Sequence, residues 1–582
     1  MSNRAPLAAL LALVVGVGAE AQNVSEARDY LPSDFYEIAV EQYAETEPGY
    51  FFLGLYRSGY QPPNYIVTFD SEGVPIYYRD VCVFDYKYHP SNGTITFFTI
   101  KSVRGIPAGF LHILDTRYRT ERVAHITSAD WGDAHEALFE PDGDVLYFGR
   151  DLDTVDMSQY VANGDTSIIV DVNIYRQTPS GEVELVWKPS EFLPFTDSET
   201  SLAQGTIDYI HSNAIEFDDD AYLVSHRNMS SITKIDTATG EVIWRWGGKS
   251  NQFTFVGDSL GFSAQHMIRK TPQATYTIFD NGNNHYPSFS RGLEYELDQD
   301  SMVATLVQEF VTSPTLYSYA MCSMQRLDEG NTLLGFSHNH KGFEFDETGA
   351  ELATIEIAPS YALFYRMFKY NIPNTAFVAD GDSAERDTLR FNGDGSTDTI
   401  TLFNPYSHDL AINAVFSGSQ TFSSAEDLPI TVPSGGSHTV TITYNTPPDS
   451  LLPPPSEDHL YIASYTDTLG FARDIVALID DPVAVERDDE TPDEFLVAGA
   501  YPNPFNAGTL LEYQLAEPAE TTIEIYSTLG EKLHERSGRK VAGVHRERLD
   551  FSLWSAGVYV VVVSAKYDNH TARTYVKTVL LK

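Results

Sequence analysis

Two kinds of β-hairpin alternate along the chain between residues 50 and 357, and this alternation constrains the fold more than any other feature. In the first kind, a polar turn containing Gly separates two apolar strands, as in residues 137–147 and 325–334. In the second kind, an Asp and a Gly-Glu turn precede an aromatic strand end, as in residues 234–244. Helical periodicity is almost absent. The sequence therefore predicts an all-β fold.

One hairpin of each kind makes a four-stranded sheet, and radial repetition of such sheets is the β-propeller solution to exposed sheet edges. A single β-sandwich does not explain why the two hairpin types alternate. We predict a six-bladed β-propeller over residues 22–372, with residues 361–370 leaving the propeller. The blades are expected to begin near Tyr50, Asp85, His135, His211, His266 and Cys322.

Four further segments have a different character. Residues 1–21 predict a secretory signal peptide, because an apolar run follows Arg4 and a small-residue cleavage site ends at Ala21. Residues 373–482 contain strands that alternate with period two and predict an immunoglobulin-like sandwich. Residues 483–497 predict an acidic linker, and residues 498–582 predict a small β-sandwich.

The formal charge of the 582-residue chain is −44. Such a field repels nucleic acid and anionic membranes, so we expect neither as a partner. An anionic substrate can bind only where positive groups are concentrated locally. Cys82 and Cys322 form no metal-binding pattern, and the sequence leaves open whether they pair.

Three histidines occupy the same position in successive blades. His135, His211 and His266 each lie eight residues before the turn of the first hairpin in their blade. The strand that leads into this hairpin lines the channel of a propeller, so we expect the three rings to converge at one mouth. The equivalent position of the sixth blade is Cys322.

The hairpin geometry adds further polar groups to this mouth. Reflecting His211 through its turn gives Arg227 as a cross-strand neighbour, and Asn213 lies on the same strand face as His211. By the same reflection, Arg150 is expected near His135, and Asp280 or Asn281 near His266. Three His, one Arg and one Asn are suited to holding an oxyanion.

Other interpretations of the histidines stay open at this point. A histidine on a strand is often a satisfied core or rim residue, and three imidazoles also suit zinc, although Arg227 argues against a bound cation. Residues 247–250 read Gly-Gly-Lys-Ser, but the first glycine of a nucleotide-binding loop would fall at Ile243, so we expect a strand and turn at this point.

Several motifs resemble the bacterial arylsulfate sulfotransferases. They are 208–213, the Arg227 hairpin, 239–245, 262–266, 279–283 and 290–295. The resemblance implies a six-bladed propeller that needs no cofactor and no nucleotide sulfate donor. It implies that His266 is transiently sulfated, that His211 and Arg227 hold the sulfate with Asn213 in the same motif, and that His135 lies on the phenol side.

The sequence departs from this family at two places. Met267 stands where the family usually has Asp after the sulfated histidine, and Glu136 follows His135 in a variable context. These departures leave the chemistry in place and the substrate open.

The last unit resembles the C-terminal sorting domain of the type IX secretion system. Its specific parts are Tyr-Pro-Asn-Pro-Phe at 501–505 and Ser-Ala-Gly-Val-Tyr at 555–559. The resemblance implies export to the outer surface or the medium of a Gram-negative bacterium, with the type IX machinery as a partner. Another small β-domain with the same turn chemistry is the alternative.

The resulting hypothesis is ping-pong transfer of a sulfuryl group from an aryl sulfate to a phenol through a sulfohistidine at His266. Two rivals remain. One is a surface propeller that binds glycans or protein without catalysis, and the other is a hydrolase that passes the group to water. The natural donor and acceptor, the oligomeric state, the role of the sandwich and the fate of the sorting domain are left open.

Overall fold

The computed structural model describes two stretches of the chain. They are residues 30–479 and 496–580, apart from gaps at 60, 104–105, 127–130, 162–163, 165, 373–376, 378–387, 418–421, 446–456, 502–507, 528–531, 552–553, 555–556 and 568–570. The predicted signal peptide, almost all of the predicted acidic linker and most of the 501–505 motif lie outside the described residues.

Strands make up nearly all of the regular structure, which confirms the predicted all-β class. The helical elements of the described residues are short 3₁₀ turns: η1 (Pro189–Glu191), η2 (Phe195–Asp197), η3 (Arg227–Met229) and η4 (Ser337–Asn339). In the part of the chain that is described, no helix has the length and apolar character that crossing a membrane requires.

Six sheets fill residues 37–370, and each runs outward from an inner strand. The first contains β27 (Ala362–Tyr370), β2 (Tyr50–Arg57), β3 (Tyr65–Phe69) and β4 (Pro75–Asp80). The second contains β5 (Phe84–His89), β6 (Thr94–Val103), β7 (Ile106–Leu114) and β8 (Thr120–His125). The third contains β9 (Trp131–Phe139), β10 (Val145–Asp156), β11 (Thr166–Gln177) and β12 (Val183–Trp187), and β13 (Thr206–Ile207) also pairs with β11.

The other three sheets follow in chain order. The fourth contains β14 (Ser212–Asp218), β15 (Ala221–His226), β16 (Ser231–Asp236) and β17 (Val242–Gly247). The fifth contains β19 (His266–Lys270), β20 (Tyr276–Asp280), β21 (Arg291–Asp298), β22 (Val303–Phe310) and β18 (Thr254–Val256). The sixth contains β23 (Ser323–Arg326), β24 (Thr332–Phe336), β25 (Lys341–Phe345), β26 (Glu351–Ala358) and β1 (Glu37–Gln42).

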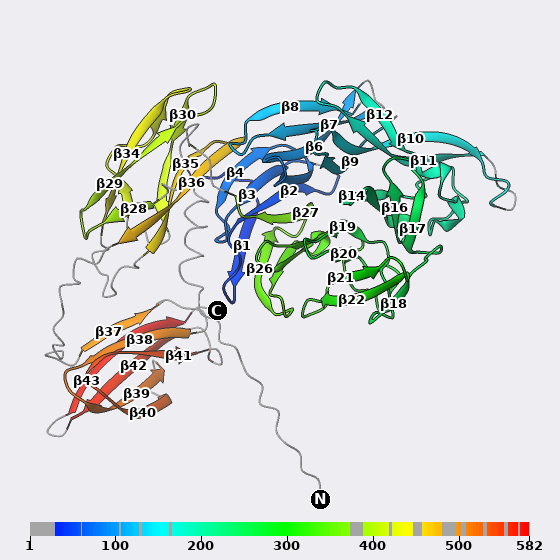
Figure 1. The fold of residues 1–582 in the computed structure, drawn as a ribbon. Helices are drawn as coiled ribbons and strands as arrows, with labels where there is room; N and C mark the ends of the chain where they lie inside the picture. The colour runs from blue at the N-terminus through cyan, green and yellow to red at the C-terminus, as the bar shows by residue number, and fades with distance from the viewer. Residues whose placement is uncertain are drawn as a thin grey trace, which may run out of the picture.

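The inner strands of these sheets form a closed ring (Figure 1). In order around the ring, β27, β5, β9, β14, β19 and β23 lie each beside the next, and β23 lies beside β27 again. Such a radial arrangement leaves few sheet edges exposed. It places residues from different sheets around one axis.

The strand that closes the ring, β27, lies in a segment that was predicted to be outside the propeller. Residues 361–370 were predicted to leave the propeller, but β27 pairs antiparallel with β2 and is the inner strand of the first sheet. The partners Phe52 and Phe368 are more than 300 positions apart in the chain. No local sequence signal shows which distant strand completes a sheet.

The predicted hairpins are confirmed, and their glycines explain why the chain turns where it does. Residues 137–147 pair as β9–β10 around Gly143, and residues 234–244 pair as β16–β17 around Gly240. Both glycines have positive φ, 92° and 72°, a conformation that costs glycine little. The remaining predicted hairpins, at 180–187, 325–334 and 345–352, pair as β11–β12, β23–β24 and β25–β26.

The sandwich that follows is joined to the first sheet rather than separate from it. Its strand β36 (Leu469–Ile479) pairs with β4, so the first sheet continues through β36 into β35 (Glu457–Tyr465) and β31 (Ala414–Ser417), and β28 (Thr388–Phe391) also pairs with β36. The other sandwich strands are β29 (Thr397–Phe403), β34 (Ser437–Tyr444) and β32 (Phe422–Ser424) in one sheet, and β30 (Leu410–Ile412) with β33 (Ile430–Val432) in another.

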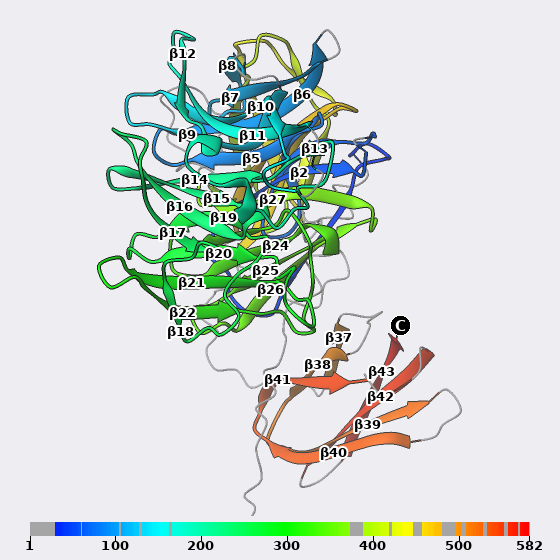
Figure 2. The same cartoon turned by 90° about the vertical axis from the view of Figure 1, so that its right-hand side faces the viewer.

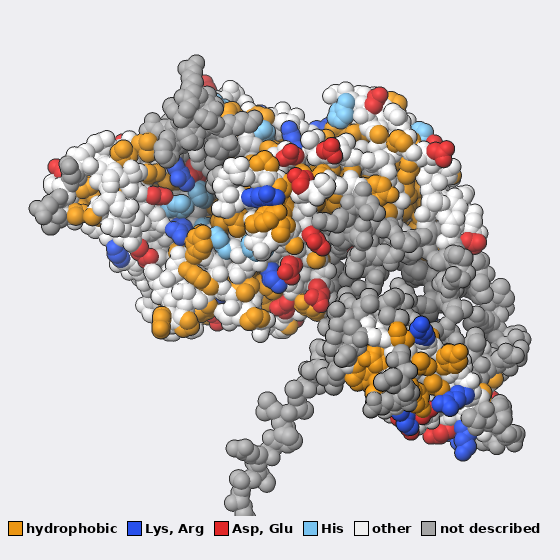
Figure 3. Space-filling model, turned by 180° about the vertical axis from the view of Figure 1, so that it is seen from behind, with side chains coloured by type: hydrophobic (Ala, Val, Ile, Leu, Met, Phe, Trp, Pro, Cys, Tyr) orange, Lys and Arg blue, Asp and Glu red, His pale blue; other side chains and the backbone are white. Residues whose placement is uncertain are grey.

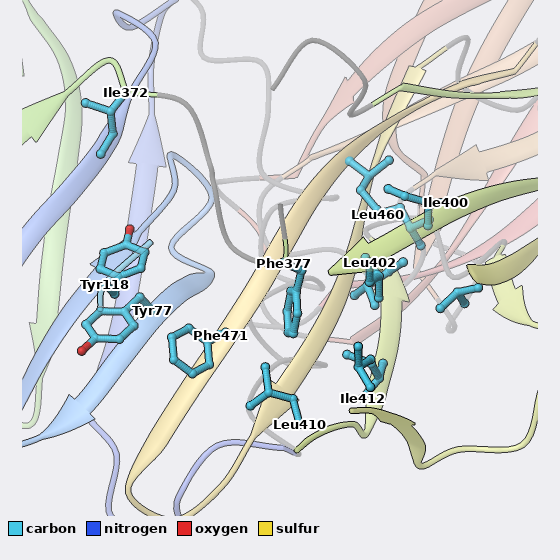
Figure 4. Close-up of a cluster of buried hydrophobic side chains, with 14 of the residues drawn as sticks. Tyr77, Tyr118, Ile372, Phe377, Ile400, Leu402, Leu410, Ile412, Leu460 and Phe471 are labelled. Atoms are coloured by element: carbon cyan, nitrogen blue, oxygen red, sulfur yellow. The ribbon is translucent and has the colours of Figure 1, made fainter. Parts of the chain in front are cut away.

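One hydrophobic core runs across this junction (Figure 4). The rings of Tyr77 and Tyr118 stack with centroids 4.0 Å apart, and Phe471 of β36 lies 5.5 Å from Tyr77. The same buried cluster continues to Leu402 and Ile412 in the sandwich. Burial in one shared core predicts that the two parts lose their structure together.

The C-terminal strands form a separate two-sheet unit (Figure 2). One sheet contains β37 (Leu496–Tyr501), β38 (Gly508–Leu515) and β41 (Gly543–Asp550). The other contains β40 (Lys532–Lys540), β39 (Ala519–Ser527), β42 (Gly557–Lys566) and β43 (Thr571–Leu580). The unit has its own hydrophobic core, which includes Leu511 and Val561.

We predict that Leu402→Ala in the sandwich destabilises the six-sheet ring. Leu402 is fully buried, and a Leu→Ala change in a core costs about 2–5 kcal/mol of unfolding free energy. No tryptophan falls within residues 373–482, and the only tryptophan after them is Trp554. In a Trp554→Phe background, tryptophan fluorescence therefore reports the ring alone. The denaturation midpoint of this signal should fall.

The exposed Val307→Ala in β22 is the control, and it should change stability by no more than about 0.5 kcal/mol. A tryptophan transition that Leu402→Ala leaves in place would show that the sandwich unfolds independently.

Candidate active site

Three histidines from neighbouring sheets lie close to one another, and two of them contact one tyrosine. His135 lies in β9, His211 directly precedes β14, and His266 begins β19. The rings of His135 and His211 have centroids 5.0 Å apart. Tyr365 of β27 lies 5.4 Å from His135 and 6.4 Å from His266. The structure thus brings together the three histidines that the sequence singled out. In Figure 3, histidine and basic side chains gather in one region of the surface.

Two of these histidines are each held by a carboxylate. His135 Nδ1 lies 2.8 Å from Asp133 Oδ1, and Arg150 Nε donates to Asp133 Oδ2 at 2.7 Å. His211 Nδ1 lies 2.6 Å from Asp208 Oδ2. A carboxylate on Nδ1 favours the tautomer with the proton on that nitrogen and orients the ring. Both Nε2 atoms are then the ones left for a ligand.

The titration of these groups reflects burial and pairing. Burial raises the pKa of Asp133, but the charges of His135 and Arg150 outweigh it and hold that pKa below its usual value. Burial also raises the pKa of Asp208, but the hydrogen bond and the charge of His211 outweigh burial and lower that pKa. Burial lowers the pKa of His211, and Asp208 offsets part of this effect. His211 is therefore a mostly neutral imidazole at pH 7, with a carboxylate ready to stabilise its cation.

His266 is buried and neutral. It is 2% exposed, its Nδ1 lies 2.7 Å from Asn281 Oδ1, and the backbone N–H of Met321 donates to its Nε2 at 3.2 Å. Since an amide oxygen only accepts, Nδ1 carries the proton and Nε2 carries the lone pair. Burial and the charge of Arg227 hold the pKa of His266 well below its usual value. A neutral imidazole with a defined lone pair is a potential nucleophile.

Arg227 supplies a positive charge whose hydrogen bonds, among the described residues, go to uncharged groups. Its NH1 and NH2 groups donate to Asn228 Oδ1 at 2.8 Å and to the Tyr319 carbonyl at 3.1 Å, and neither acceptor is a carboxylate. Its buried Nε has no hydrogen-bond partner within the part of the chain that the structure describes. Burial lowers the pKa of Arg227, yet an arginine stays charged. The guanidinium is therefore available to an anion.

The predicted opposition of Arg227 and His211 is present in the backbone. Ser212 pairs with His226, and the Arg227 N–H donates to the His211 carbonyl at 3.1 Å. Regular strand geometry ends there, however. His211 has φ 51°, and the register shifts between Ser212 and Ala214, so Asn213 is bulged. The prediction that Asn213 lies on the same strand face as His211 assumed a regular strand, and the bulge breaks this regularity.

Asn213 is accordingly buried rather than open. Its side chain is fully inaccessible, and its Nδ2 donates to the Gln265 carbonyl at 2.8 Å. Its Oδ1 has no hydrogen-bond partner among the described residues. In this position Asn213 links β14 to the residue before His266, and substrate binding by Asn213 stays a prediction.

Unusual backbone conformations concentrate around the site. Five non-glycine residues near it have φ between 50° and 84°: His211, Ala264, Met267, Met321 and Cys322. Such conformations cost on the order of 1–3 kcal/mol each and cluster where function needs a fixed geometry. Cys322 lies at the predicted equivalent position of the sixth sheet, and its thiol donates to Ser318 Oγ at 3.0 Å. Cys82 and Cys322 are both free.

Inner strands also contribute a buried set of charges, the axial charge cluster. Its members are Asp85 and Lys87 of β5, Glu136 of β9, Glu216 of β14, Arg269 of β19 and Arg366 of β27. Arg366 NH1 donates to Asp85 Oδ1 at 2.7 Å and to Glu136 Oε2 at 3.0 Å. Arg269 NH2 also reaches Glu136, at 2.7 Å. Glu136, which departs from the family pattern, is thus an ion-pair partner.

The pKa values of the carboxylates in this cluster reflect a balance between burial and the charges of nearby cations. Burial raises the pKa of Glu136, but Arg269, Arg366 and Lys87 together bring it below its usual value. Burial raises the pKa of Glu216 to about 7, against the opposing charge of Arg269. Arg366 NH2 also donates to the Asn213 carbonyl at 2.6 Å. The cluster is thereby tied to the strand that follows His211.

A possible metal-binding group lies in a turn between β9 and β10. Among the residues that the structure describes, Glu140, Asp142 and Asp144 form the one set whose ligand atoms lie within reach of a single ion. Glu140 already accepts hydrogen bonds from Tyr222 and Arg176.

Comparison with known proteins assigns two parts of the chain. Residues 90–357 match the family model of the arylsulfotransferases (ASST), and residues 499–577 match that of the secretion system C-terminal sorting domain. This region of the chain is therefore similar to the arylsulfotransferases. Both resemblances noted in the sequence are confirmed. A search of curated proteins finds no match.

Solved structures are only distantly similar. A protein of unknown function from Bacteroides caccae is 12% identical with a TM-score of 0.33, over 56% of this chain and 99% of its own. An inactive virginiamycin B lyase from Staphylococcus aureus, solved with Quinupristin, is 10% identical with a TM-score of 0.28, over 56% of this chain and 89% of its own. A streptogramin B lyase is 14% identical with a TM-score of 0.27, over 55% and 98%. These scores are too low to support an argument about this chain.

The sorting domain fixes where the protein acts. A type IX secretion sorting domain directs its carrier to the cell surface or the extracellular space of Bacteroidetes-type bacteria. The protein is therefore exported to the cell surface or the extracellular space.

Several contacts of the candidate active site were not predicted from the sequence. Asp133 and Asp208 were visible as acidic residues two and three positions before a histidine, which is a usable signal. Asn281 was one of two residues expected near His266, and it is the one that bonds the ring. Tyr365 and Met321 gave no local signal, because they arrive from β27 and from the segment before β23.

We predict that Arg227→Met raises the pKa of His266. The positive charge of Arg227 is the second cause, after burial, that keeps this pKa low, so its removal makes protonation easier. Titration of the histidine ring resonances by NMR measures the shift. In the wild type, His266 should stay neutral well below pH 6.5, whereas in the variant its protonation should begin at higher pH.

Arg57→Met is the matched control, because Arg57 contacts the exposed ring of Tyr361. The electrostatic account fails if Arg227→Met leaves the His266 titration unchanged.

Proposed function

We propose that this protein is an arylsulfate sulfotransferase that moves a sulfuryl group from an aryl sulfate ester to a phenol through a sulfohistidine at His266. The ASST family match supports the reaction class. The observation that carries the assignment of the nucleophile is the neutral state of His266, whose Nδ1–H is held by Asn281 while Arg227 lowers its pKa. No nucleotide sulfate donor takes part in this scheme.

In the first half-reaction, the Nε2 lone pair of His266 attacks the sulfur. The N–S bond forms as the bond between sulfur and the aryl oxygen breaks, and the departing phenolate takes a proton from a histidine. Arg227 and His211 stabilise the charge on the sulfuryl oxygens, as cationic groups do in phosphoryl transfer. Before the reaction, the Met321 N–H donates to Nε2 of His266. Once Nε2 is bonded to sulfur, its lone pair is no longer free, so the Met321 N–H donates to a sulfuryl oxygen instead.

His135 and His211 are the two candidates for the proton donor. Each has a carboxylate on Nδ1, Asp133 and Asp208 respectively, and such a carboxylate stabilises the imidazolium. In its imidazolium form, either histidine carries a second proton on Nε2 and can release it to the phenolate. The ring of the sulfated His266 keeps its Nδ1–H on Asn281 and carries a positive charge, so it leaves as a neutral imidazole and is a good leaving group.

In the second half-reaction, the acceptor phenol attacks the same sulfur. The histidine that gave its proton takes one from the phenol, the new S–O bond forms, and the N–S bond breaks. His266 returns to its neutral state. The enzyme ends as it began, and one aryl ester has been exchanged for another.

We predict that purified protein releases 4-nitrophenol from 4-nitrophenyl sulfate only when a second phenol is present. His266→Ala should lower this turnover by about 10³-fold or more, because it removes the nucleophile. Arg227→Met should lower it by about 10²–10³-fold, as loss of a charge-stabilising donor does. Absorbance of the released phenolate measures the rate.

His408→Ala, an exposed histidine of the sandwich, is the matched control and should turn over normally. Release without added phenol would identify a hydrolase. The absence of release under both conditions, or full activity of His266→Ala, would contradict the proposal.

A further inference from the structure

Residues 311–322, between the fifth and sixth sheets, cross the active site as a strap. The Tyr319 carbonyl accepts from Arg227 NH2 at 3.1 Å and from Asn283 Nδ2 at 3.1 Å. Two residues later, the Met321 N–H reaches His266. The strap therefore contacts both the guanidinium and the nucleophile.

The strap presents two tyrosines to solvent. Tyr319 is 54% exposed and Tyr317 is 39% exposed, and both rank among the exposed large apolar side chains of the described residues. The Tyr319 carbonyl is hydrogen-bonded to Arg227, and Asn283, which donates to the same carbonyl, accepts from the Tyr317 hydroxyl. Both tyrosines therefore lie on the part of the strap that contacts Arg227.

Both side chains are held in place rather than free. The ring of Tyr319 packs on His338 with centroids 4.1 Å apart. The hydroxyl of Tyr317 donates to Asn283 Oδ1 at 3.3 Å. An aromatic side chain that is fixed yet exposed offers contact area at a small cost in conformational entropy. Pairs of aromatic rings attract each other beyond the effect of simple burial.

The anchoring of the strap explains how its position is maintained. Ser318 N donates to Ser290 Oγ at 2.9 Å, and the Ser318 carbonyl accepts from Asn281 Nδ2 at 2.7 Å. Asn281 is the residue that also orients His266. The tyrosines and the nucleophile thus share one hydrogen-bonded support, which fixes the distance between the ring-binding surface and the reacting nitrogen.

We infer that Tyr317 and Tyr319 form the aryl-binding wall of the site and favour substrates with two or more fused rings over single-ring phenyl esters. The inference rests on the proposed function, because it assumes that Arg227 holds the sulfate group while the aryl ring extends toward the strap. A larger ring system covers more of the two exposed tyrosines. An inorganic anion contacts Arg227 without needing either ring.

The test measures equilibrium binding to the full-length His266→Ala protein, in which transfer is blocked. The probes are 4-methylumbelliferyl sulfate, 4-nitrophenyl sulfate and inorganic sulfate. We expect Tyr319→Leu and Tyr317→Leu each to weaken 4-methylumbelliferyl sulfate about three- to tenfold. Inorganic sulfate binding should change less than about twofold, and the preference for the two-ring ester should fall.

Two further variants guard against indirect effects. Tyr319→Phe keeps the ring and should restore binding of 4-methylumbelliferyl sulfate, which a general disturbance of the strap would not allow. Tyr575→Leu removes an exposed tyrosine of the sorting domain and should bind all probes normally.

The inference is overturned if the leucine variants weaken the binding of inorganic sulfate as much as the binding of the aryl esters. It is also overturned if they weaken the binding of neither. It is also overturned if the wild-type site shows no preference for the two-ring ester. Failure of the proposed function gives a different result. The protein would then bind aryl esters through the two tyrosines but would transfer no sulfuryl group.

Discussion

The axial charge cluster is the constraint on which the arrangement of the inner strands depends. A buried ion costs several kcal/mol unless opposite charges and hydrogen bonds surround it, and removing one partner of such a pair is strongly destabilising. Glu136 meets cations from three other inner strands, and Arg366 reaches both Glu136 and the Asn213 carbonyl. These contacts fix how the strands bearing His135 and Tyr365 approach one another. The candidate site therefore lies against the axial charge cluster, and the pairing of these charges sets the geometry of the strands that carry the site.

Above the axial charge cluster, the proposed chemistry depends on the Arg227 cation beside the neutral ring of His266. The chain is strongly acidic, so a site for an anion needs a local positive charge that is not hydrogen-bonded to a carboxylate. Arg227 meets this requirement because, among the described residues, its side-chain hydrogen bonds go to an amide and a carbonyl oxygen. The same charge and deep burial keep His266 unprotonated. In the proposed reaction, attraction of the substrate and neutrality of the nucleophile thus have a common cause.

Two strand pairings that join distant parts of the chain hold the six-sheet ring and the sandwich together. The pairing of β27 with β2 closes the ring and delivers Tyr365 to the three histidines. The pairing of β36 with β4 extends the first sheet into the sandwich, where Phe471 joins the core around Tyr77. The sandwich therefore supports the ring, while the sorting domain has a core of its own.

The sequence by itself determined the all-β class, the hairpins with their glycine turns, and the opposition of His211 and Arg227, because strand periodicity and turn chemistry act over a few residues. It also drew attention to the three histidines and to Asn281. Only the tertiary structure decided that β27 closes the ring, that Asn213 is buried in a bulge, and that Met321 contacts His266. The physical reason is that those contacts depend on which distant strands pair and on where buried charges find partners, and neither is encoded within a local stretch of chain.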